Sequence, residues 1–282
     1  MYIFLTVISA FLLAGYDVFK KIGSKYSENL YEMLFFYTFI SFLCSIFFAF
    51  DAVSVGLDII AFVFIKSSVI SLSWFFTMKA ISRLDVSFVT PFSMLGVVST
   101  TLLASIIFKE NIGVIQIGGS LLILLGLVLL VRIDEKKGNK KNDYKYAIYL
   151  AIAAFLSSFS AVIDRKLLFN VGKETVIFWF FFFLALIYFV VCLIRNRKIE
   201  FINLKNNLWL VLVGVSIFLS DLFYCWALSY SDGLLSIVSI VRKLSVFISV
   251  VLACLFLKER DFTKKILLLV LMFVGLGGIL FI

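Results

Sequence analysis

The chain has 282 residues, of which 63% are hydrophobic and 15% charged, with one proline and no histidine. About a quarter of the residues of a soluble domain are charged, and no soluble core hides so much apolar surface. The composition therefore excludes a soluble globular protein. The net charge of +9 is assigned to short basic loops at a membrane and not to nucleic-acid binding.

Continuous apolar runs of about 18 or more residues recur along the whole sequence and predict ten membrane-spanning helices. The runs do not alternate between apolar and polar residues, which argues against a β-barrel. The first run lacks a basic leader and a small-residue cleavage site, so we expect it to be retained. The predicted spans are 3–22, 31–50, 60–82, 86–108, 112–132, 146–167, 175–194, 208–230, 233–257 and 265–282.

A basic linker, DEKKGNKKNDYK at 134–145, divides the sequence into halves 1–133 and 146–282 with five predicted spans each. The halves resemble one another in two pairs of segments: ISRLDVSFVT (81–90) with LSYSDGLLSI (228–237), and SIIFKENIG (105–113) with ACLFLKERDF (253–262). An odd number of spans per half requires the two repeats to enter the membrane in opposite orientations. The predicted fold is an all-α integral membrane protein of ten helices in two inverted five-helix repeats.

Lysine and arginine gather in the loops after the first, third, fifth, seventh and ninth predicted spans. The positive-inside rule places those loops in the cytoplasm and both termini outside. We therefore expect a multi-pass protein of the cytoplasmic (plasma) membrane.

The segment 91–130, PFSMLGVVSTTLLASIIFKENIGVIQIGGSLLILLGLVLL, resembles the signature of the EamA-type drug/metabolite transporters. In that family a proline-containing fourth span leads through a short charged turn into a glycine-rich fifth span. The triplets KEN (109–111) and KER (258–260) stand at those turns in the two halves. The resemblance implies a transporter whose cavity is lined by spans one, three, four, six, eight and nine. It leaves the substrate open, because the superfamily moves amino acids, sugars, nucleotide sugars, choline, drugs and phosphorylated metabolites.

Two adjacent positive charges, Arg242 and Lys243, stand inside the ninth predicted span. Arg242 and Asp221 each lie about ten residues from the turn between spans eight and nine, which places both near the centre of the hydrocarbon core. A charge at that depth costs about 3 kcal/mol, so it must be paired, hydrated, or both. An Asp221–Arg242 ion pair is one interpretation and substrate binding is the other; under either, Lys243 remains.

Two further charged groups lie inside the predicted spans. Asp17 is placed to neutralise Lys243, although Lys21 follows Asp17 by one helical turn. Lys66 has no acid nearby in sequence, and its long side chain is expected to reach toward the membrane surface. The interior then holds two acidic and three basic groups. The surplus cation favours a substrate with a carboxylate or phosphate.

Polar and aromatic residues accompany these charges at helical spacing. The predicted substrate-binding residues are Arg242, Lys243, Asp221, Tyr224, Ser239, Asp17, Tyr16, Lys66, Trp74 and Thr77. The Arg242-Lys243 pair is also similar, in reversed order, to the Lys and Arg that hold phosphate on the ninth span of triose-phosphate translocators.

We predict neither cofactor nor metal, because the four cysteines (Cys44, Cys192, Cys225, Cys254) lie in apolar spans without a CxxC motif or a histidine partner. No HExxH or paired-acid constellation is present, so we do not expect an enzyme. The expected partners are a small-molecule substrate and the lipid bilayer, with no nucleic acid, and the expected state is a monomer or homodimer.

The predicted function is a secondary transporter or exchanger of a small polar metabolite with an anionic group, working by alternating access. An amino acid, an organic anion and a phosphorylated metabolite all fit this description. The alternative is an exporter of organic cations or drugs that recognises its substrate through Asp17 and Asp221.

Overall fold

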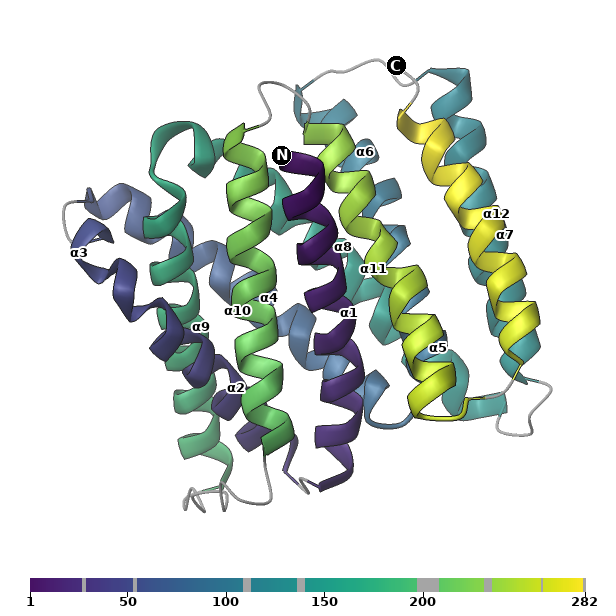
Figure 1. Ribbon diagram of the computed structural model, residues 1–282, viewed down its shortest axis with the longest axis horizontal. Coiled ribbons are helices and arrows are strands. Elements are labelled where there is room, and N and C mark those ends of the chain that lie inside the picture. The colour runs from purple at the N-terminus through teal and green to yellow at the C-terminus, as the bar shows by residue number, and fades with distance from the viewer. Residues whose placement is uncertain are drawn as a thin grey trace.

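A computed structural model describes residues 1–26, 29–52, 55–108, 113–135, 140–196, 208–230, 235–259 and 261–280. Within these ranges the chain is entirely helical, with no strand (Figure 1). The first half contains α1 (Tyr2–Tyr26), α2 (Leu30–Ser45), η1 (Ile46–Phe48), α3 (Ala49–Ala52), α4 (Leu57–Ile81), α5 (Val86–Val89), η2 (Thr90–Met94), α6 (Leu95–Phe108) and α7 (Val114–Glu135). The second half contains α8 (Lys140–Asn170), α9 (Lys173–Asn196), α10 (Leu208–Tyr230), α11 (Leu235–Phe256) and α12 (Phe262–Leu280).

The predicted spans correspond to this helix order. Nine helical segments of the described chain are long and apolar enough to cross a membrane, and α11, which carries Arg242 and Lys243, stands beside them as the tenth helix of the bundle. The second predicted span consists of α2, η1 and α3, and the fourth consists of α5, η2 and α6. The prediction of an all-α fold with ten helices is confirmed.

The principal helix contacts join the two halves of the chain. Helix α1 packs against α10 and α11, and its counterpart in the second repeat, α8, packs in the same way against α4 and α6. Helices α2 and α7 pair with α9 and α12, which hold the corresponding positions in the second repeat. These exchanged contacts are what two inverted repeats produce when they pack around a common axis.

Both chain ends lie at one end of the bundle: α1 begins and α12 ends at the upper end in Figure 1. The lower end in that view carries the last turn of α1 and the turn between α11 and α12. We call it the basic end, because Lys25, Arg83 and Lys264 lie there.

The single proline interrupts the fourth span. Pro91 lies in the first turn of η2, a 3₁₀ segment between α5 and α6, so it breaks the regular helix inside the span. Proline has no N–H and clashes with the preceding turn, and 3₁₀ geometry weakens local hydrogen bonds. Pro91 therefore interrupts the fourth span and does not stand at its beginning.

Helices α7 and α12 touch backbone to backbone along the edge of the bundle. A Cβ atom on Gly275 would lie 2.6 Å from the carbonyl oxygen of Gly119, and one on Gly119 would collide with the carbonyl of Gly275. Such an approach is open only to glycine, as in other small-residue contacts between membrane helices. The two glycines therefore allow α7 and α12 to pack closely at this point.

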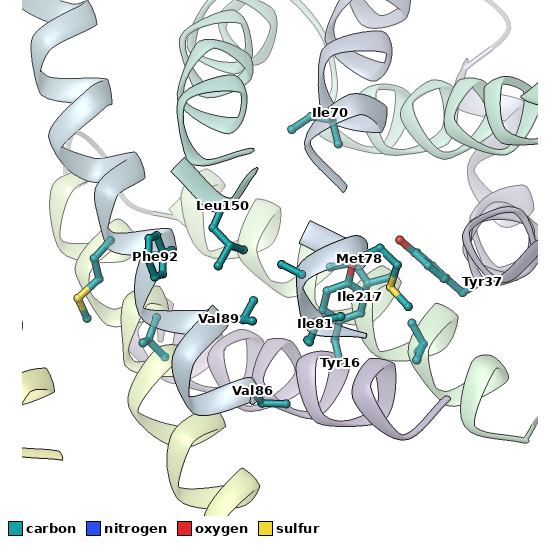
Figure 2. Close-up of a cluster of buried hydrophobic side chains, with 14 of the residues drawn as sticks. Tyr16, Tyr37, Ile70, Met78, Ile81, Val86, Val89, Phe92, Leu150 and Ile217 are labelled. Carbon is teal, nitrogen blue, oxygen red and sulfur yellow. The ribbon is translucent and has the colours of Figure 1, made fainter. Parts of the chain in front are cut away.

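A contiguous apolar core fills the middle of the bundle. Figure 2 shows part of it, where the rings of Tyr16 and Tyr37 come from different helices and reach toward Met78 and Ile81. All four side chains are at most 5% exposed. The core brings α1, α2 and α4 together beside the charged groups described next.

Candidate functional site

The first ion pair joins α10 and α11. Arg242 Nη2 lies 2.5 Å from Asp221 Oδ1, and both side chains are about one-fifth exposed, at 20% and 21%. The guanidinium carbon also lies 4.0 Å from the ring centroid of Tyr224, a cation–π contact. The Nε group of Arg242 is buried and has no hydrogen-bond partner in the described chain. The ion pair that we inferred from matching depths is therefore present, with one donor of the arginine left over.

Lys243 has a different environment from its neighbour. Its Nζ donates a hydrogen bond of 3.0 Å to the backbone carbonyl of Ser93, in the 3₁₀ segment η2. Within the described part of the chain it forms no ion pair with a carboxylate. Asp17, which the sequence placed to neutralise Lys243, attracts it at longer range but is paired directly with Lys20. A neutral carbonyl satisfies one of the three ammonium donors but does not neutralise the charge.

Asp17 is paired within α1. Its Oδ1 lies 3.5 Å from Lys20 Nζ, and its Oδ2 accepts a hydrogen bond of 3.3 Å from Ser249 Oγ on α11. The neighbour that we named from the sequence, Lys21, points elsewhere and donates to the carbonyls of Ile81 and Leu84. The expectation that Lys21 would be the cation beside Asp17 was wrong, because the α1 helix turns Lys20 toward Asp17 and Lys21 toward the end of α4.

Lys66 does have an acidic partner. Its Nζ lies 2.5 Å from Asp164 Oδ1 on α8, and it also lies 4.3 Å from the ring centroid of Phe180. Lys66 is 8% exposed, so its ammonium group stays inside the bundle and does not extend to the surface. The expectation of an unpartnered Lys66 was wrong because Asp164 is remote in sequence and belongs to the other repeat.

The two interhelical ion pairs also act on one another. Asp164 interacts electrostatically with Asp221 and Arg242 as well as with Lys66. We call these four residues, from α4, α8, α10 and α11, the charge cluster. Its two cations and two anions balance, so the cluster as a whole carries no net charge.

The interior charges can now be counted again over the described chain. Three carboxylates, from Asp17, Asp164 and Asp221, each lie within 3.5 Å of a cation. Lys243 is the additional cation. The sequence missed Asp164 and Lys20, but adding one acid and one base leaves the surplus of one positive charge unchanged.

The aromatic members of the predicted site form one group. The ring of Trp74 lies 5.7 Å from Tyr37 and 6.1 Å from Tyr16, measured between centroids. Phe180, the ring under Lys66, lies 6.3 Å from Trp74 in an edge-to-face arrangement. The rings thus connect α1, α2, α4 and α9 beside the charge cluster.

Two predicted site residues are less informative. Thr77 donates its hydroxyl to the carbonyl of Ser73 in its own helix, an ordinary arrangement for threonine in a membrane helix. Ser239 belongs to α11, but its side chain lies outside the part of the chain that the structure describes. The KEN triplet (109–111) is also outside the described residues.

The helices define a multi-pass integral membrane protein with two inverted repeats and charged groups in its interior, the architecture of a transporter. The sequence matches the EamA-like transporter family over residues 1–132 and again over residues 144–281. The chain therefore belongs to the EamA-like transporter family, and the protein is a membrane transporter of small molecules.

The fold is shared with a solved structure described only as the crystal structure of a protein. That structure aligns with a TM-score of 0.65 at 16% sequence identity, over 97% of this chain and 94% of the other. A search among curated proteins finds no match.

Proposed function

We propose that the protein is a secondary transporter or exchanger in the cytoplasmic membrane, and that its substrate is a small polar metabolite with an anionic group. Lys243 is the anchor for that group. The observation that supports this assignment is that every carboxylate of the described interior already lies beside a cation, whereas Lys243 has no carboxylate in direct contact. Its Nζ donates a hydrogen bond to the carbonyl of Ser93, and Asp17, which is already paired with Lys20, attracts it at longer range.

A cation without a carboxylate in direct contact is costly at this depth, and a ligand that supplies such a contact explains why the cation is retained. A carboxylate or phosphate oxygen would replace the carbonyl of Ser93 and bring an opposite charge, which the neutral carbonyl does not provide. The Nε group of Arg242, which has no partner among the described residues, is a second donor on the adjacent residue.

Transport would follow alternating access, with the repeats moving against each other around the charged centre. The contacts that exchange between the halves, such as α1 with α10 and α4 with α8, are compatible with such a motion. The organic-cation alternative is less well supported, since Asp17 and Asp221 are both occupied by cations of the protein itself.

The proposal can be tested on purified protein with a thermal-shift screen of carboxylates, phosphate esters, amino acids and organic cations. We expect an anionic or zwitterionic compound to raise the unfolding temperature, since a ligand at 100 times its Kd stabilises a protein by about 2.7 kcal/mol. The variant Lys243→Ala should abolish that rise, and uptake of the same compound into proteoliposomes should fall with it.

Lys264→Ala is the matched control, because Lys264 is an exposed lysine at the basic end whose side chain is 68% accessible. It should leave both measurements unchanged. Stabilisation by organic cations alone, or an anion response that survives Lys243→Ala, would overturn the proposal.

A further inference from the structure

At the basic end, the second repeat holds the beginning of α5 in the first repeat. Glu259, in the turn between α11 and α12, accepts hydrogen bonds through Oε1 from the backbone N–H of Val86 (2.8 Å) and through Oε2 from that of Ser87 (3.0 Å). The hydroxyl of Ser87 also donates to Oε2. One carboxylate therefore satisfies the first free N–H groups of the fourth span, which would otherwise lack partners.

A buried lysine completes this contact. Lys265, at the start of α12, is 1% exposed, and its Nζ bonds to the hydroxyl of Ser87 and lies 3.5 Å from Asp85 Oδ2. We call Asp85, Ser87, Glu259 and Lys265 the latch. Burial of an ammonium group is tolerated only where its donors and charge are met, so the latch is a specific contact and not a chance meeting of surface groups.

The latch is connected to the proposed substrate anchor by a short stretch of chain. Ser87 lies in α5, and Ser93, whose carbonyl accepts the hydrogen bond from Lys243, follows in the adjoining η2. The second repeat therefore holds this stretch at both ends, through Glu259 at the basic end and through Lys243 in the interior. Its middle contains the 3₁₀ segment with Pro91, where the chain bends more readily than in a regular helix.

We infer that the latch keeps the basic end of the transporter closed and must open when substrate passes through that end. Glu259 is a positioning residue: by fixing the start of α5 it holds the carbonyl of Ser93 against Lys243. An anion that binds Lys243 in place of Ser93 frees the η2 end of this stretch in the interior. That favours release of its α5 end, at the basic end of the bundle, from Glu259. This second step rests on the proposed function, whereas the closure itself does not.

Val86 provides a reporter of closure. Its side chain is 0% exposed and belongs to the buried cluster of which Figure 2 draws part, while its backbone N–H binds Glu259. Val86→Cys, in a background without the four native cysteines, keeps that bond. Reaction of this cysteine with a charged maleimide in lipid nanodiscs, where both faces are accessible, measures how often the basic end opens.

We expect Glu259→Gln to raise the initial labelling rate by roughly tenfold or more, since a hydrogen bond to a charged group contributes more than one decade in an equilibrium constant. Lys258→Gln is the matched control, because it removes a charge from the same turn at an exposed residue. It should change the rate by less than about twofold. Lys265→Met should act in the same direction as Glu259→Gln and serves if that variant does not fold.

Unchanged labelling in both Glu259→Gln and Lys265→Met would overturn the latch. Lys243→Ala tests the connection, and we expect it to raise labelling where Lys264→Ala does not; an unchanged rate would overturn that connection alone. None of these measurements needs a substrate. A ligand screen that finds no anionic ligand would therefore refute the proposed function and leave the latch standing. Unchanged labelling rates would refute the latch and leave the proposed function standing.

Discussion

Removing one member of the Asp221–Arg242 pair should destabilise the protein more than removing both. Two opposite charges 4 Å apart attract by about 4 kcal/mol at an effective dielectric constant of 20 and by about 1 kcal/mol in water. The two side chains are about one-fifth exposed, at 20% and 21%, so the pair lies between these limits. We therefore expect a coupling energy of about 2–3 kcal/mol.

The assay is a double-mutant cycle with Asp221→Asn, Arg242→Gln and the double variant, measured as apparent unfolding temperature in detergent. Each single change leaves an uncompensated charge in the bundle and should lower that temperature by roughly 5–10 °C. The double variant should lose less than either single one. Losses that simply add would refute the reasoning, because the two groups would then contribute independently.

The exposed pair Lys264–Asp261 provides the control cycle. Its atoms are 3.5 Å apart, but the lysine side chain is 68% exposed and the aspartate 30%. Solvent screens such a pair, so its coupling should be between about 0 and 1 kcal/mol. A coupling as large as that of the interior pair would show that burial is not the cause.

Two more predictions use the same unfolding assay. Gly275→Val should lower the unfolding temperature by roughly 3–10 °C, because overpacking costs about 1–3 kcal/mol and the new side chain meets the backbone of Gly119; an unchanged temperature would contradict the close contact. Lys66→Gln should lower the unfolding temperature more than Lys66→Arg, because arginine keeps a cation beside Asp164 and over the ring of Phe180. Equal losses of unfolding temperature would show that the size of the side chain, and not its charge, matters there.

The number and order of the helices were predictable because hydropathy depends only on local sequence. The Asp221–Arg242 pair was predictable for a related reason, since both residues are counted from the same turn and antiparallel neighbours share depth. Asp164 was not predictable as the partner of Lys66, because their contact depends on how the repeats pack. The choice between Lys20 and Lys21 beside Asp17 depends on the rotation of α1, which a spacing of three or four residues does not fix.

The latch shows the same limit at the basic end. The KER triplet (258–260) stood out in the sequence as a charged turn, but nothing local indicated that Glu259 binds the backbone of α5. Ser87 looked like an ordinary residue of the ISRLDVSFVT segment. Their contact joins two of the four segments that the repeat comparison singled out, 81–90 from the first half and 253–262 from the second. Only the three-dimensional packing of inverted repeats brings them together.

The ion pair between the halves has a consequence for biogenesis. Lys66 enters the membrane with the first repeat, whereas Asp164 is made about a hundred residues later, which takes roughly 5–20 s at ordinary rates of synthesis. During that interval the first repeat also lacks α8, α10 and α12, against which its own helices pack. The nascent first half must therefore be shielded by the insertion machinery, or held at the lipid surface, until the second half arrives to complete it.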